Sequence, residues 1–310
     1  MAFLPCIRAL HIVATMLLGG ALAFDFLILR RCGEAARDAA VAPVLDRWIA
    51  QQCAWAIAIG LVSWTAWLAA VTVTMSGLPV AEALAPDILA MVIERTTFGH
   101  VWLIRLVAFV VLGVLVWRRS ARGFAFALAA LLAASLAWTG HALGSNRLHP
   151  WVDALHLLAA SAWLGMLPLL WLVTKNGLAE PARWRELAIA SAGKFFLPGA
   201  VAVAVLAASG LANTSWMLDS ISDFFDTTYG RILSAKLALF ATMLVLAIVN
   251  RLVIIAGGKR ADDTESTLRR LRAGVVAEIV LGAAILVIVA WLGVTPPPAH
   301  DHVGHSMESM

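Results

Sequence analysis

The sequence predicts an all-α, polytopic membrane protein with eight transmembrane helices arranged as two parallel four-helix repeats. Three observations lead to this fold class. The chain is 62% hydrophobic and only 14% charged, whereas soluble domains carry about 25% charged residues. Its apolar residues gather in eight runs long enough to cross a bilayer as helices. Short motifs then recur in the same order in the two halves of the chain.

The eight apolar runs set the expected spans. A transmembrane helix needs about 20 predominantly apolar residues. The runs that meet this requirement are residues 4–29, 48–75, 101–117, 124–143, 151–173, 195–213, 232–255 and 274–294.

The basic residues set the expected orientation. Of the 23 Lys and Arg residues, 17 fall in the first, third, fifth and seventh connections, and basic residues concentrate on the cytoplasmic side of a membrane. We therefore expect a bacterial cytoplasmic (inner) membrane protein with both termini in the periplasm. Cleavage of a signal peptide after Ala23 would place these basic connections outside, so we interpret the first run as a retained helix. The pI of 9.3 follows from these connections, and no nucleic-acid partner is expected.

An internal duplication is predicted from matching segments. The first run contains Ala9-Leu10-His11, and the fifth contains Ala154-Leu155-His156, 145 residues later. Thr96-Thr97-Phe98-Gly99 and Thr227-Thr228-Tyr229-Gly230 match at an offset of 131. Because both halves start outside, the repeats would be related by an axis along the membrane normal. The expected domains are residues 1–143, residues 144–295 and a periplasmic tail of residues 296–310.

All eight histidines fall on the expected outer side of the membrane. Ionisable groups inside a bilayer are costly and mark functional sites by default, and imidazole is a ligand for copper, zinc or haem iron. The alternative is that these histidines cross-link helices through hydrogen bonds. The residues predicted to form a metal site are His11, His100, His141, His149, Asp153 and His156.

The C-terminal tail follows three prolines and is polar, which is typical of disordered segments. Histidine-rich tracts are read as metal-binding, and thioether together with imidazole favours copper. A solvated terminus of chance composition is the alternative. The expected metal-capturing residues are His300, His302, His305, Met307 and Met310.

Other charged residues lie at membrane depth. Near the outer side these are Arg8, Arg105, Arg231 and Lys236. They would disfavour a bound cation but would pair well with haem propionates, or they could pair with acidic residues of the outer loop. Asp25 and Glu278 lie toward the cytoplasmic ends of their runs, where pairing with basic residues is the simpler interpretation and a relay or exit ligand is the alternative.

Several of these segments resemble the copper resistance protein D (CopD) family. They are Thr139-Gly140-His141-Ala142, Asp153-Ala154-Leu155-His156, Trp163-Leu164-Gly165, Thr228-Tyr229-Gly230-Arg231, Asn250-Arg251 and Glu278-Ile279-Val280-Leu281-Gly282. The resemblance implies an eight-helix inner-membrane protein that handles copper beside a periplasmic CopC-like carrier. It also implies that His141 and His156 are the membrane histidines of the family. Because no CopC-like domain is appended here, that partner would be a separate protein.

From these residues and this resemblance we expect a copper-homeostasis protein that moves copper (Cu⁺ or Cu²⁺) from the periplasm to the cytoplasm and is not an enzyme. The sequence contains no GxxxxGK[ST] loop of an ATPase. One alternative is a membrane redox protein that holds haem b between paired histidines, like a protoporphyrinogen oxidase. Another is a membrane sensor or scaffold for a periplasmic copper carrier.

Overall fold

The structure, a computed structural model, describes residues 4–139, 147–218, 220–257, 264–293 and 295, and these residues form only helices, turns and bends. Eight of the helical segments are long and apolar enough to cross a membrane, which confirms the all-helical prediction and its eight spans. These segments are Leu4–Arg31, Ala42–Ser76, Thr97–Trp117, Arg122–Thr139, His149–Ala179, Pro181–Met217, Thr228–Leu252 and Thr264–Leu292.

The first four spans contain most of the short helical pieces. The first span is α1 (Leu4–Ala23), continued by a π-helical turn, η1 (Phe24–Ile28), and a 3₁₀ turn, η2 (Leu29–Arg31). The remaining elements are α2 (Glu34–Arg37), α3 (Ala42–Ser76), α4 (Val80–Ala83), α5 (Pro86–Arg95), α6 (Thr97–Trp117), α7 (Arg122–Ala134) and η3 (Ser135–Thr139).

The last four spans are accompanied by fewer short helical pieces. The fifth span is divided at Gly165 into α8 (His149–Leu164) and α9 (Leu167–Ala179). It is followed by α10 (Pro181–Met217), α11 (Asp223–Asp226), α12 (Thr228–Gly257) and α13 (Thr264–Leu292). The fifth connection, predicted between residues 173 and 195, is itself almost entirely helical, because charged residues end the apolar run without ending the helix.

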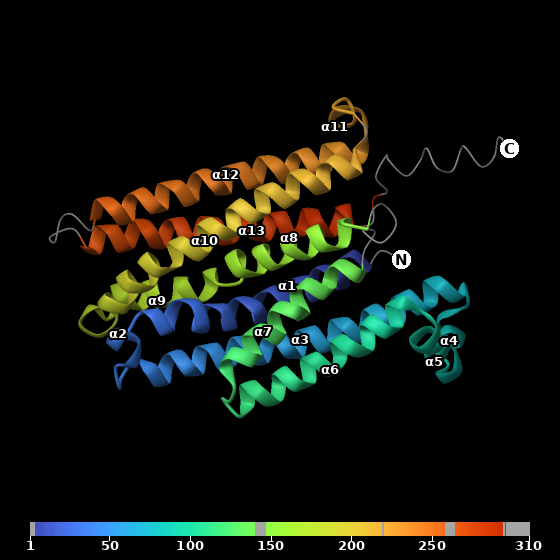
Figure 1. Cartoon of the computed structure of the whole chain (residues 1–310), viewed down its shortest axis with the longest axis horizontal. Coiled ribbons are helices and arrows are strands. Elements are labelled where there is room, and N and C mark those ends of the chain that lie inside the picture. The colour runs from blue at the N-terminus through green and yellow to red at the C-terminus, as the bar shows by residue number, and fades with distance from the viewer. Residues whose placement is uncertain (1–3, 140–146, 219, 258–263, 294, 296–310) are drawn as a thin grey trace.

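The helices form an elongated bundle (Figure 1). α1 and α8 run through its middle, with α3 and α6 on one side and α10, α12 and α13 on the other. α1 begins and α13 ends at the same end of the bundle, together with α4, α5 and α11. We call this the α5 end, and the opposite end, where α2 lies, the α2 end.

The bundle is centred on the crossing of α1 and α8. Leu18 and Ala21 of α1 and Phe24 of η1 are fully buried, because the first span is surrounded by other helices rather than by lipid. A Cβ on Gly20 would overlap the backbone of Gly165, so the two helices pack backbone to backbone. Small residues permit such close helix packing in membranes. The outer helices, by contrast, expose many apolar side chains, such as Leu103 of α6 and Val245 of α12.

Candidate functional site

Two histidines lie in the α5-end half of the bundle, one in each half of the chain. His11 of α1 has no exposed surface. Its Nδ1 lies 3.1 Å from both Gly60 O and Ser63 Oγ, and its Nε2 lies 2.8 Å from an Nη of Arg105. Because a guanidinium only donates hydrogen bonds, Nε2 must accept and Nδ1 must carry the ring proton. Both ring nitrogens of His11 are therefore used.

The pocket around His11 is closed. The His11 ring stacks on Trp64 with centroids 4.6 Å apart, and the Phe109 ring meets it at 5.7 Å in an edge arrangement. Arg105 is 1% exposed and its guanidinium lies 5.0 Å from the Trp64 ring centroid. Arg105 also donates to Leu132 O and Ser135 Oγ, each at 2.5 Å. The guanidinium thus occupies the position beside Nε2 that a metal ion would need.

His156 of α8 makes a similar bond through Nδ1 but has a different environment. Its Nδ1 lies 3.0 Å from Ser209 Oγ in α10. The Ser209 hydroxyl donates to Val205 O at 2.6 Å, so its oxygen accepts the proton of Nδ1 and the lone pair of the imidazole is left on Nε2. Within the described residues, no hydrogen bond to Nε2 of His156 is found.

Gly210 lies next to the Cε1 and Nδ1 atoms of the His156 ring. The nearest atom to a Cβ placed on Gly210 would be Cε1 of His156, at 3.6 Å, which is ordinary van der Waals contact. No aromatic ring stacks on His156 in the part of the chain that the structure describes, in contrast to His11. The His156 side chain is only partly buried.

Charged and polar groups lie beside His156. Asn213 of α10 donates to Asp153 Oδ1 at 3.3 Å, one helical turn from His156 along α8. Lys236 of α12 lies close enough to Asp153 and His156 for its charge to act on both. The Asp153 carboxylate, the Asn213 amide and the Lys236 ammonium thus lie around an imidazole whose lone pair is on Nε2.

The other predicted site residues lie apart from these two pockets. His149 is the first residue of α8 and is buried, with its ring 5.0 Å from Trp216. His100 is exposed near the start of α6 and its Nε2 lies 3.0 Å from Glu94 O. Arg8 donates to Gly293 O at 2.6 Å, and Arg231 is exposed at the start of α12.

His141 and the tail residues His300, His302, His305, Met307 and Met310 lie outside the described residues. Among the residues that are described, no three His, Cys, Asp or Glu side chains lie together as a group that could hold a metal ion. The assignment of these residues as metal ligands therefore stays a prediction.

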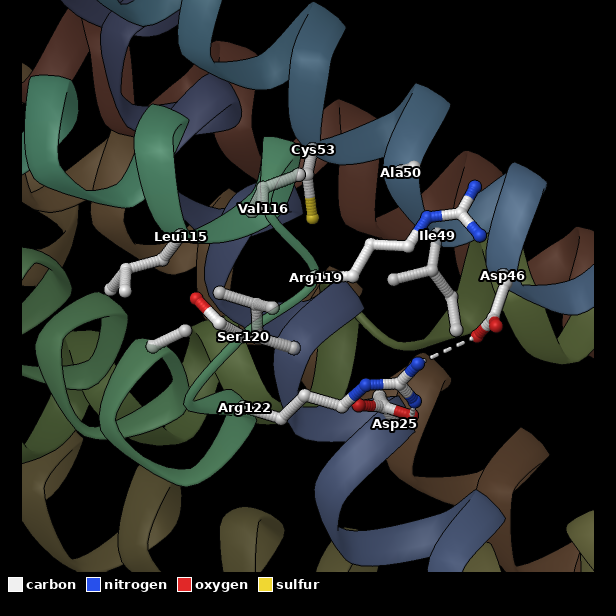
Figure 2. Close-up of a pocket in the computed structure, with 12 residues that line it drawn as sticks. Asp25, Asp46, Ile49, Ala50, Cys53, Leu115, Val116, Arg119, Ser120 and Arg122 are labelled. Atoms are coloured by element: carbon white, nitrogen blue, oxygen red, sulfur yellow. Dashed lines mark hydrogen bonds and ion pairs between the residues drawn. The ribbon is translucent and has the colours of Figure 1, made fainter.

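Acidic residues toward the α2 end also take defined positions. Arg122 bridges Asp25 at 3.1 Å and Asp46 at 3.0 Å, beside a small pocket into which the Cys53 thiol points (Figure 2). The pairing of Asp25 with a basic residue agrees with the simpler interpretation of the sequence. Within the described residues Glu278 forms no such ion pair, and its carboxyl oxygens accept hydrogen bonds from Asn250 and Trp163.

Sequence reasoning missed the residues that distinguish the two histidine pockets. Ser63 follows His11 by 52 residues and Ser209 follows His156 by 53, a near match that a search for hydrogen-bonding partners could have found. Trp64 and Gly210 are the next residues in each half, but nothing in the sequence said that they face the histidines.

Comparison with known families was made over the whole chain. Residues 1–146 match the family described as "Copper resistance protein D-like, N-terminal domain", and residues 189–292 match the family "Copper resistance protein D". The chain is 33% identical over 226 residues to a protein named copper resistance protein D from Pseudomonas syringae pv. tomato, covering 67% of this chain and 71% of that protein. This chain belongs to the copper resistance protein D family.

Two further relatives support this membership. The chain is 31% identical to inner membrane protein YebZ of Escherichia coli (strain K12), over 76% of this chain and 81% of that protein. It is 30% identical to copper transport protein CutJ of Bacillus subtilis (strain 168), over 70% of this chain but only 40% of that protein. No solved structure matches the chain. This member of the copper resistance protein D family is therefore a multi-pass protein of the inner membrane.

Proposed function

We propose that this protein moves copper from the periplasm toward the cytoplasm and that His156 is its intramembrane copper ligand. The observation that carries this proposal is the Nε2 lone pair of His156, which the hydrogen bond of Nδ1 to Ser209 leaves on that nitrogen and which has no hydrogen-bond partner within the described residues. A neutral imidazole is the form that binds a metal ion, and imidazole suits copper. The names of two relatives, a copper resistance protein and a copper transport protein, agree with copper as the cargo.

Ligation by His11 is less suited to the observed geometry. Copper could reach Nε2 of His11 only if Arg105 moved away, which would break its bonds to Leu132 and Ser135 as well. A hydrogen bond to a charged group is typically worth about 1.5–3 kcal/mol, and several would be lost at once. We therefore propose that His11 orients Arg105 in the scaffold while His156 receives the ion.

The outer histidines and the tail would capture copper before it enters. His100 is exposed at the α5 end of the bundle, at the side where the chain begins. The tail residues His300, His302, His305, Met307 and Met310 follow α13, which ends at the same side. We propose that these groups and His141 supply copper to His156, and that a separate periplasmic carrier of the CopC type delivers it. This assignment includes the orientation with both termini in the periplasm, which the distribution of basic residues supports.

The pairing of the two pockets supports a duplicated architecture, which we also propose. His11 with Ser63 corresponds to His156 with Ser209. Thr96 caps α6 by accepting from Gly99 N at 2.9 Å, and Thr227 makes the same contact with Gly230 N at 2.9 Å before α12. Gly20 and Gly165, which are 145 residues apart like His11 and His156, meet where α1 crosses α8, as expected for residues near an axis that relates two repeats.

Reconstitution of the purified full-length chain into liposomes tests the proposed function. We expect Cu(I) to enter the vesicle lumen faster than in protein-free liposomes, and elemental analysis to find copper in protein with no Soret absorption band. Copper binding without uptake would favour the sensor or scaffold. A Soret band that disappears in His156→Ala would instead identify a haem protein and overturn the copper site.

A further inference from the structure

Glu278 is a buried carboxyl group in the interior of the bundle. It lies in α13 and is 3% exposed. Asn250 of α12 donates to Glu278 Oε1 at 2.6 Å, and the indole N–H of Trp163 in α8 donates to Oε2 at 3.2 Å. A Cβ on Gly274 would overlap the Asn250 amide, so α13 holds that amide tightly in place. Three helices thus form a site around one carboxyl group.

The two hydrogen-bonding partners of Glu278 are neutral, and within the described residues no cation forms an ion pair with it. The helices packed against α13 carry few charged residues, and these contact groups other than Glu278. On α12, Arg251 lies over the Phe196 ring and Lys236 lies beside Asp153. On α9, Lys175 lies over the Trp171 ring.

The charges of the remaining neighbours are also placed elsewhere. In the first span, Arg8 of α1 bonds Gly293 O, and Asp25 of η1 is paired with Arg122 at the α2 end. The ionisable groups of α8, namely His149, Asp153 and His156, lie at least seven residues before Trp163. On α13 itself, Arg269 is paired with Glu265. Arg272 and Arg270 lie six and eight residues before Glu278, toward the α2 end.

An unpaired carboxylate in this place is unfavourable. Insertion scales for an ionised carboxylate at the centre of a membrane helix correspond to a penalty on the order of a hundredfold. The two neutral donors offset only part of this penalty, whereas a bound proton removes the charge entirely. Intramembrane carboxyl groups with this setting serve as proton carriers in pumps and transporters.

The position of Glu278 relates it to the proposed copper ligand. Trp163 lies seven residues after His156 on α8, which is two helical turns or about 10 Å along the axis. The two residues therefore share one face of α8. A change in the packing of α8 around His156 would also change the contact between Trp163 and Glu278.

We propose that Glu278 is the proton-binding group that couples copper movement to proton movement in this protein. In the conformation described here the carboxyl group is buried and holds its proton. In a conformation that admits water it would release the proton as H⁺ and take one up again on reburial, with no electron transfer. This proposal rests on the proposed function, since coupling requires that copper be moved.

Infrared difference spectroscopy tests the bound proton directly, without copper. The wild type at neutral pH should show the carbonyl stretch of a protonated carboxylic acid, which is lost in Glu278→Gln. The matched control Asp25→Asn removes an ion-paired carboxylate and should leave that band intact. Asn250→Leu, which removes the shortest hydrogen bond, should shift the band to higher frequency. If the wild type and Glu278→Gln show no difference in this region, the proposal is overturned.

Copper uptake into proteoliposomes under an imposed pH gradient tests the coupling. We expect the wild-type rate to change severalfold with the gradient and the Glu278→Gln rate to be insensitive to it. A gradient-insensitive wild type that still takes up copper would contradict the coupling while leaving the proposed function standing. Absence of copper uptake by the wild type would remove the proposed function and the coupling together, whereas the infrared band would still report the proton on Glu278.

Discussion

The His11 and His156 pockets share a hydrogen bond from Nδ1 to a serine and a nearby cation, and they differ in how Nε2 and the ring are contacted. Each histidine uses Nδ1 to bond a serine of a neighbouring long helix. At His11 the other nitrogen is bonded to Arg105 and the ring is stacked on Trp64. At His156 the corresponding positions leave Nε2 without a partner in the described residues and place Gly210 against the ring.

This difference shows that burial of a histidine in a membrane does not by itself indicate a metal site. Both serines fix the imidazole tautomer by accepting from Nδ1, which makes Nε2 the nitrogen with the lone pair in each pocket. A guanidinium then consumes that lone pair in one pocket only. The availability of the lone pair distinguishes a ligand from a hydrogen-bonded link between helices.

The largest expected effect comes from replacing each histidine by alanine. His156→Ala should lower intramembrane copper affinity by more than about 100-fold, since even indirect support of a metal ligand is worth 10–100-fold. His11→Ala should leave copper affinity near the wild-type value but lower the free energy of unfolding by roughly 2–5 kcal/mol, because it creates a cavity and strands a donor of Arg105. Copper titration and thermal unfolding in detergent measure the two quantities.

The two variants serve as controls for each other because each removes one imidazole bonded to one serine. The proposed difference between the two pockets would be wrong if His11→Ala lost copper while His156→Ala retained it. Equal loss of copper in both would mean that Arg105 leaves Nε2 and that the two histidines ligate together.

A smaller effect is expected from placing an aromatic side chain next to the His156 ring. Gly210→Trp gives α10 a tryptophan beside His156, as Trp64 of α3 lies beside His11. It should weaken copper binding about tenfold by covering the ring, and overpacking should lower the free energy of unfolding by roughly 1–3 kcal/mol. Gly210→Ala is the matched control, because a Cβ there makes only ordinary contact with the His156 ring at 3.6 Å. Copper titration of both variants decides the point. If Gly210→Ala and Gly210→Trp weakened copper binding equally, covering of the His156 ring by the aromatic side chain would not explain the loss.

The fold was largely predictable because membrane helices are specified by hydrophobic length. All eight spans were found from apolar runs, and the family membership agrees with the segments that suggested it. Helix ends were less predictable. α3 and α10 extend beyond their apolar runs to Ala42 and Pro181, because backbone hydrogen bonding continues where hydropathy falls. The break of the fifth span at Gly165 was not anticipated.

The candidate site was less predictable from the sequence. Composition identified His11 and His156 as intramembrane histidines without distinguishing them, whereas the family resemblance singled out His156 together with His141. Their difference depends on Arg105, which lies 94 residues from His11, and on which side chain faces each ring. Such contacts depend on the rotation of packed helices, which hydropathy does not specify. Glu278 was expected to pair with a basic residue, and the geometry instead gives it Asn250 and Trp163.

The smallest expected effect comes from deleting residues 299–310, which carry His300, His302, His305, Met307 and Met310. These side chains offer additional copper ligands near the outer face and would raise the local copper concentration, whereas His156 would still bind the ion within the bundle. Deletion should therefore lower copper uptake only a few-fold, and only at low copper. It should leave the contrast between His156→Ala and His11→Ala unchanged, or make it clearer, because fewer other ligands contribute to the titration. Uptake measured over a range of copper concentrations, in the full-length and truncated chains, tests this. Complete loss of uptake at every concentration would mean that the tail is part of the path and that His156 cannot receive copper without it.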